Sequence, residues 1–125
     1  MRQCLIVDGS PEERRNAADI LAGLGFAARE AADAEVAIAR CREQMPDLIL
    51  LEIRAAVDAV TFLRRLRRLR GGTRARVLMV TGGDDAAAIG AAIWHGAEEY
   101  LVKPLDPEIL AFKLQQIGTP AEHAA

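Results

Sequence analysis

Apolar positions along the chain alternate between short continuous runs and helical stripes. The central run is PDLILLE at residues 46–52, in which Leu48, Ile49, Leu50 and Leu51 leave no polar face. A run this short predicts a strand buried on both sides, as in a parallel sheet covered by helices. Similar runs predict further strands at residues 3–8, 26–31, 76–81 and 98–102.

Helical patterns separate these predicted strands. Ser10 as N-cap, Pro11 as the first helical residue and Glu13 three positions after the cap form a capping-box signature for a helix that ends near Gly25. Further helices are predicted at residues 33–44, in the segment with apolar residues at 62, 63, 66 and 69 that Gly71 and Gly72 terminate, at residues 84–95, and from the Asp106 cap to residue 118.

Alternation of strands and helices with short connections predicts a doubly wound α/β sandwich with a parallel sheet. The right-handed crossover rule and the buried central strands favour the strand order 2-1-3-4-5. We expect one domain at residues 1–118, followed by a short tail at residues 119–125.

Composition narrows the class of protein. The chain has 125 residues, 51% of them hydrophobic, and a formal net charge of -2, which fits one ordinary globular domain. No apolar stretch approaches the ~20 residues of a membrane span, and the N-terminus lacks a signal peptide pattern. We therefore expect a cytoplasmic protein without membrane insertion. Cys4 and Cys41 have no partner at ligand spacing, so we predict neither a disulfide nor a zinc site.

Four polar residues come at the predicted carboxyl ends of strands, where ligands of such sheets gather. They are Asp8, Glu52, Thr81 and Lys103. Any one of them could be only a turn former or a helix cap. Lysine occurs at only two positions among the sixteen basic residues, and a compact ammonium followed by Pro104 suits a point charge directed at an anion.

Several segments together resemble a known family. LIVDGSPEERR, PDLILLE, FLRRLR, VLMVTGG and GAEEYLVKP are similar to segments of the receiver domain of bacterial two-component response regulators. The likeness extends over essentially the whole chain and is greatest to the stand-alone, chemotaxis-type receivers of flavodoxin-like (βα)5 fold. It implies an aspartate after strand three that accepts a phosphoryl group from a histidine kinase, two acids after strand one that hold Mg²⁺, and a Thr and a Lys that bind phosphoryl oxygens.

The residues that form the predicted strands and helices match the family, whereas several residues at its metal and phosphoacceptor positions do not. Gly9 stands where the second acid of the metal pair is expected, and Glu52 stands where the phosphoacceptor aspartate is expected. Ala55 and Ala56 replace the usual Met-Pro of the following loop. Asp8 matches one acid of the family's metal pair, and the positions that match its switch are Thr81, Tyr100, Lys103 and Pro104.

These departures predict a degenerate, non-enzymatic site. Magnesium requires near-ideal octahedral oxygen geometry, so Asp8 and Glu52 without a second acid should bind it weakly or not at all. We expect no other cofactor. Glutamate adds one methylene, roughly 1.5 Å of reach, and ~1 Å of misplacement can cost about 100-fold in rate. Phosphotransfer to Glu52 is therefore not expected.

Two roles for the altered acid stay open. The longer Glu52 carboxylate could approach Thr81 and Lys103 and imitate a phosphoryl group in part, with one charge against about -1.5 to -2. Alternatively, Arg54 could lie between Asp8 and Glu52 as an internal cation. The competing hypothesis is that Arg54 extends into solvent.

If the chemistry is lost, the output should lie in surfaces. In receivers the face of helix four, strand five and helix five binds partners, and here it would include Trp94, Tyr100 and Phe112. Ile89 and Ile93 mark the predicted buried side of helix four, so Trp94 lies toward its edge. A large aromatic among small residues is a candidate hot spot, although Trp94 could also pack over the edge of strand five as core.

An arginine cluster is the other unusual surface. It contains no acid, so its field is not neutralised locally. A solvated helix face is the simpler interpretation, and an anion such as an acidic protein or a cyclic dinucleotide is the alternative. The cluster comprises Arg64, Arg65, Arg67, Arg68 and Arg70.

The sequence thus predicts an atypical single-domain response regulator, a pseudo-receiver that acts through phosphorylation-independent protein binding. Expected partners are a histidine kinase or a motor or adaptor component, with no DNA, and the protein should be a monomer or weak dimer. One alternative is a sensor of an anionic nucleotide such as cyclic di-GMP through the arginine cluster. Another is a phosphotransfer-competent receiver that uses a different acid, such as Asp58.

Overall fold

Five parallel strands form the centre of the computed structural model, which describes residues 1–119. The strand order is β2-β1-β3-β4-β5, as the crossover rule predicts. Each predicted strand is present within about one or two residues of its expected ends. The strands are β1 (Arg2–Val7), β2 (Phe26–Ala31), β3 (Leu48–Glu52), β4 (Arg76–Thr81) and β5 (Glu99–Val102).

Local sequence signals explain where the helices begin. The Ser10 hydroxyl accepts a hydrogen bond from the Glu13 N–H at 3.2 Å, and Asp106 accepts the N–H groups of Glu108 and Ile109. The helices are α1 (Pro11–Gly23), α2 (Ala34–Glu43), α3 (Ala59–Arg68), α4 (Ala86–Trp94) and α5 (Pro107–Gln116), with a 3-10 helix η1 (Ile53–Ala55) after β3.

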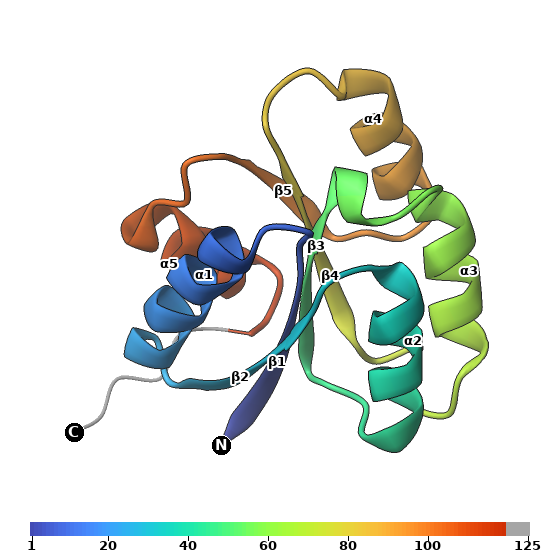
Figure 1. The fold of residues 1–125 in the computed structure, drawn as a ribbon, viewed down its shortest axis with the longest axis horizontal. Helices are drawn as coiled ribbons and strands as arrows, with labels where there is room; N and C mark the ends of the chain where they lie inside the picture. Colours follow the sequence, from blue (N-terminus) through green and yellow to red (C-terminus); the bar gives the residue numbers. More distant parts are fainter. Residues whose placement is uncertain (120–125) are drawn as a thin grey trace.

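The helices cover the sheet on both faces (Figure 1). On one side lie α1 and α5, and on the other lie α2, α3 and α4. Each face has its own apolar core, one formed with α1 and α5 and the other with α2, α3 and α4. Strand β3 is buried along its whole length, which explains why its sequence carries no polar face. The flavodoxin-like doubly wound fold is confirmed.

Some details differ from the sequence-based expectation. Helix α3 ends at Arg68, so Leu69 is its C-cap residue, although its side chain still packs against the core as the apolar stripe predicts. Helix α4 is shorter than predicted at both ends, and Ile93, expected on its buried side, has 37% of its surface exposed. The 3-10 helix η1 was not predicted.

Two further expectations concern the chain as a whole. Within residues 1–119, no helix has the length and apolar character needed to cross a membrane. Cys4 and Cys41 are both buried free thiols. The tail predicted at residues 119–125 lies outside the described residues except for Thr119.

Candidate functional site

The carboxyl ends of β1, β3, β4 and β5 bring the four predicted polar residues to one rim of the sheet. Asp8, Glu52 and Thr81 are buried there, and Lys103 follows β5. Parallel register causes this meeting, because neighbouring strands end at the same edge. Lys103 is tied to this edge by its N–H, which donates to the Thr81 carbonyl at 2.8 Å. The Lys103–Pro104 peptide bond is cis.

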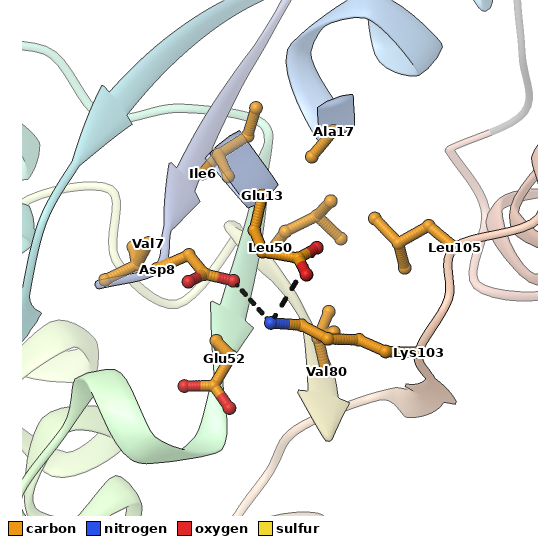
Figure 2. Close-up of a pocket in the computed structure, with 10 residues that line it drawn as sticks. All are labelled: Ile6, Val7, Asp8, Glu13, Ala17, Leu50, Glu52, Val80, Lys103 and Leu105. Atoms are coloured by element: carbon orange, nitrogen blue, oxygen red, sulfur yellow. Dashed lines mark hydrogen bonds and ion pairs between the residues drawn. The ribbon is translucent and has the colours of Figure 1, made fainter. Parts of the chain in front are cut away.

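Lys103 directs its ammonium at Asp8 rather than at Glu52 (Figure 2). Its Nζ lies 2.9 Å from Asp8 Oδ2 and 4.0 Å from Glu13 Oε2. The other Asp8 oxygen, Oδ1, accepts the Ser10 N–H at 2.9 Å. Both carboxylate oxygens of Asp8 are therefore engaged by groups of the chain itself.

Glu52 turns its carboxylate away from Lys103 (Figure 2). Its Oε2 accepts the N–H of Arg54 at 2.9 Å, so Glu52 acts as the N-cap of η1. Burial raises the pKa of this carboxyl above its ordinary value, while the Arg54 N–H and the charge of Lys103 partly oppose that rise. Glu52 therefore caps η1, and its burial disfavours the ionised form of its carboxyl group.

The side chains of Thr81 and Arg54 both approach Asp85. The Thr81 hydroxyl donates to Asp85 Oδ2 at 3.0 Å and accepts the Gly83 N–H at 3.1 Å. Arg54 Nε lies 3.9 Å from the same Asp85 oxygen, and 67% of its side chain is exposed. The structure therefore places Arg54 beside Asp85 at the edge of the site rather than between Asp8 and Glu52.

Sequence reasoning missed Asp85 and the chemical position of Glu13. Asp85 follows Thr81 by four residues, a spacing that brings it back over the strand end before α4 begins. Glu13 was assigned only a capping role, yet its carboxylate lines the cavity with Asp8, Glu52 and Lys103. The signal for Glu13 was its place in the first turn of the helix that follows Asp8.

The residues at this rim do not fit a Mg²⁺ ion. The cavity they enclose has a volume of about 10 Å³, roughly room for one water. Gly9 supplies no ligand, Glu52 faces the Arg54 N–H, and the outward oxygen of Asp8 faces an ammonium. Among residues 1–119 no cluster of three acidic, His or Cys side chains could hold a metal. Weak or absent Mg²⁺ binding stays a prediction, which titration with the metal can check.

Large apolar side chains are exposed on the face formed by α4, β5 and α5. Trp94 is 86% exposed, Phe112 60% and Tyr100 41%. The exposure of Trp94 argues against its packing as core over β5. The Tyr100 ring lies 5.2 Å from Lys113 Nζ, a cation–π contact, and Lys113 also pairs with Glu99 at 3.3 Å. Ile93 on α4, Val102 on β5 and Ile109 on α5 are also exposed.

The arginine cluster, on α3 and the residues just after it, divides into members with partners in the chain and members that are exposed. Arg67 turns inward and donates to the carbonyl oxygens of Gly72, Ala75 and Gly96. Arg65 pairs with Glu35 at 2.5 Å. The remaining members, Arg64, Arg68 and Arg70, are exposed.

Asp58, the alternative phosphoacceptor, is engaged as a helix cap. Its carboxylate accepts the Val60 N–H at 3.0 Å and the Thr61 hydroxyl at 2.9 Å. The hydrogen bond from the Thr61 hydroxyl lowers the pKa of Asp58 and outweighs burial, which acts in the opposite direction.

Comparison with known proteins identifies the family. Residues 4–115 match the response regulator receiver domain family. The chain belongs to this family. Receiver domains are signalling modules that interact with histidine kinases and other signalling proteins.

Individual relatives agree with this assignment. The chain is 31% identical to an uncharacterized response regulatory protein of Vibrio vulnificus over 127 residues, covering 100% of this chain and 51% of that protein. It thus spans about half the length of the curated relatives it matches.

Solved structures show the same fold. The chemotaxis response regulator CheY4 of Vibrio cholerae is 27% identical, with a TM-score of 0.82 over 94% of this chain and 98% of that one. A protein of Chloroflexus aurantiacus described as a response regulator is 30% identical, with a TM-score of 0.81 over 93% and 96% of the two chains.

Proposed function

We propose that this receiver domain is an atypical, pseudo-receiver module of bacterial signal transduction whose binding to partner proteins does not require phosphorylation. The observation that carries the proposal is the composition of α4, AAAIGAAIW, in which no side chain is charged. All of its residues except Ile89 and Ala92 are exposed. A helix that is apolar all round is normally covered, and a partner protein is the cover we propose.

The chemistry at the rim supports independence from phosphorylation. The Glu52 carboxylate is held by the Arg54 N–H and lies away from Lys103. In-line attack on a phosphoryl donor requires close alignment of the reacting atoms, and this carboxylate is both longer than aspartate and turned aside. Thr81 and Lys103, which would bind phosphoryl oxygens, are engaged by Asp85 and Asp8.

The position of Glu52 bears on whether it imitates a phosphoryl group. Imitation through Lys103 would need the Glu52 carboxylate to face the ammonium, and in Figure 2 it faces the opposite direction. The arrangement therefore favours a carboxylate that stabilises the local backbone. Partners would then recognise the surface around α4 whatever the state of the rim.

Intact-mass spectrometry after incubation with acetyl phosphate and Mg²⁺ tests the first half of the proposal. We expect no phosphoryl adduct, whereas a receiver with aspartate at the end of strand three, treated in parallel, should acquire one. An adduct that maps to Glu52 would contradict the proposal. An adduct at Asp58, lost in Asp58→Asn, would support the alternative of phosphotransfer through another acid.

Partner capture tests the second half. The immobilised domain is incubated with lysate of its source organism, with and without acetyl phosphate and Mg²⁺, and the retained histidine kinases, motor components and adaptors are quantified. We expect the same partner in equal amounts under both conditions. A partner retained only with the phosphodonor would show that binding depends on phosphorylation.

Nucleotide sensing through α3 stays a second prediction. Three exposed arginines, Arg64 and Arg68 on α3 and Arg70 just after it, favour an anion at this helix. An amide NMR titration with cyclic di-GMP checks it, because saturable shifts confined to α3 would indicate a nucleotide site, whereas an unchanged spectrum at high excess would exclude it.

A further inference from the structure

We propose that the ammonium of Lys103 is the resident cation of the acidic pocket, held by Asp8 and Glu13, and that it excludes a divalent ion from this rim. The inference rests on the proposed function and deepens it, because it gives a physical reason for a site that phosphorylation does not control. It also assigns a role to Glu13.

Three hydrogen bonds to oxygen atoms of Asp8 fix its position. Its Oδ1 accepts the Ser10 N–H, its Oδ2 lies 2.9 Å from Lys103 Nζ, and its backbone carbonyl accepts from Arg14 at 2.8 Å. Only 11% of the Asp8 side chain and 21% of the Lys103 side chain are exposed. An ion pair this far from solvent is screened weakly by salt.

Glu13 is free to face Lys103 because Asp8 takes over half of the capping box. In a complete capping box the Glu13 carboxylate would reach back to the Ser10 N–H. Here Asp8 Oδ1 accepts that N–H, while Glu13 donates only its own N–H to the Ser10 hydroxyl. The Glu13 carboxylate instead lies 4.0 Å from Lys103 Nζ (Figure 2).

The Lys103 ammonium partly neutralises the negative charge of the residues that line the pocket. Asp8, Glu13 and Glu52 are its three acids, and Lys103 is its one base. A cavity of about 10 Å³ remains beside them, so a hydrated Mg²⁺ could enter only if the ammonium left. Because Lys103 is held by Asp8 and Glu13, it does not move to contact an anion at the end of β3.

Thermal unfolding of a double-mutant cycle tests the assignment. Asp8→Asn, Lys103→Met and the double variant are compared with wild type, each in EDTA and in Mg²⁺. Each single change should lower Tm, and the double variant should lose less than the sum of the two losses. Mg²⁺ should leave wild type unchanged and raise the Tm of Lys103→Met, because without the ammonium Asp8 Oδ2 and Glu13 Oε2 face the cavity with no cation beside them.

Lys113→Met is the matched control. Lys113 is the other lysine of the chain, is buried to a similar degree and also pairs with a glutamate, but it lies outside the pocket. Its loss should create no sensitivity to Mg²⁺. Additive losses in the cycle, or an equal response to Mg²⁺ in wild type and Lys103→Met, would overturn the proposal.

Glu13→Gln keeps the test decisive if Lys103→Met does not fold. It should lower Tm more than Glu12→Gln, because Glu12 shares the favourable first turn of α1 but is exposed and does not line the pocket. Equal losses would remove Glu13 from the assignment. A phosphoryl adduct on Glu52 with an intact cycle would instead refute the proposed function and leave this inference standing.

Discussion

Two regions of this receiver domain differ in whether their characteristic side chains are paired within the chain or exposed to solvent. At the rim of the sheet, Asp8, Lys103 and Glu52 are buried or nearly so and find partners within the chain. On the face of α4, β5 and α5, Trp94 and Phe112 are large, apolar and exposed. The rim satisfies its own polar groups, whereas the surface leaves apolar area in contact with water. This difference is the ground for the proposal that partners bind the surface of α4, β5 and α5.

The largest expected change in stability concerns α3, where Arg67 hydrogen-bonds within the chain and the neighbouring Arg68 is exposed. Arg67→Met would leave the carbonyls of Gly72, Ala75 and Gly96 without their donor. Chemical denaturation should show a loss of about 2–3 kcal/mol in the free energy of unfolding. The exposed Arg68, changed to Met as control, should alter stability by less than about 0.5 kcal/mol. Similar losses for both variants would contradict the division of the cluster.

Trp94→Ala addresses the apolar side of the comparison. Truncating a central aromatic of an interface typically costs about 2 kcal/mol of binding, roughly a 30-fold loss of affinity for the captured partner. Calorimetric titration measures it, and stability should stay within about 0.5 kcal/mol of wild type. Val36→Ala, an exposed apolar residue on α2, should bind normally. An unchanged affinity for Trp94→Ala would remove this residue from the interface.

Gly90→Ala separates stability from binding on α4. A methyl group at Gly90 would meet no atom within 4 Å, and replacing a helical glycine by alanine should raise stability by about 0.5–1 kcal/mol. If a partner packs closely on α4, the same methyl group should weaken its binding. Thermal unfolding and partner titration of one sample measure both effects, and an unchanged affinity would place the partner away from Gly90.

The smallest expected effect lies at the rim and depends on pH. Because the pKa of Glu52 is raised in the folded state above its ordinary 4.5, ionised Glu52 lowers stability, and this loss grows as pH rises through the window between the unfolded and folded values. Glu52→Gln keeps the acceptor for the Arg54 N–H and removes the charge.

The variant should therefore gain stability over wild type, by less than about 1 kcal/mol, at neutral pH, and the gain should vanish below the ordinary glutamate pKa. Urea unfolding of both proteins from acidic to neutral pH measures it. A gain of the same size at every pH would show that ionisation of Glu52 is not its source.

The order and type of the strands and helices could be predicted from the sequence, because short-range signals encode them. The unbroken apolar run of β3 indicated a doubly covered strand, and Ser10 and Asp106 marked helix starts that the structure confirms. Parallel alternation then brought Asp8, Glu52, Thr81 and Lys103 to one edge. The sequence was therefore sufficient to predict the fold, the family resemblance and four residues of the rim, but not the places of Glu13 and Asp85 beside them.

The partner of each polar side chain at the rim could be learned only from the folded structure. Lys103 and Asp8 are 95 positions apart, and nothing in local sequence indicates that the ammonium prefers Asp8 and Glu13 to Glu52. The inward turn of Arg67 and the outward turn of Trp94 likewise depend on the packing of distant segments. Backbone preferences are set within a few residues, whereas the pairing of long side chains is set by the space and charge that the folded chain leaves around them.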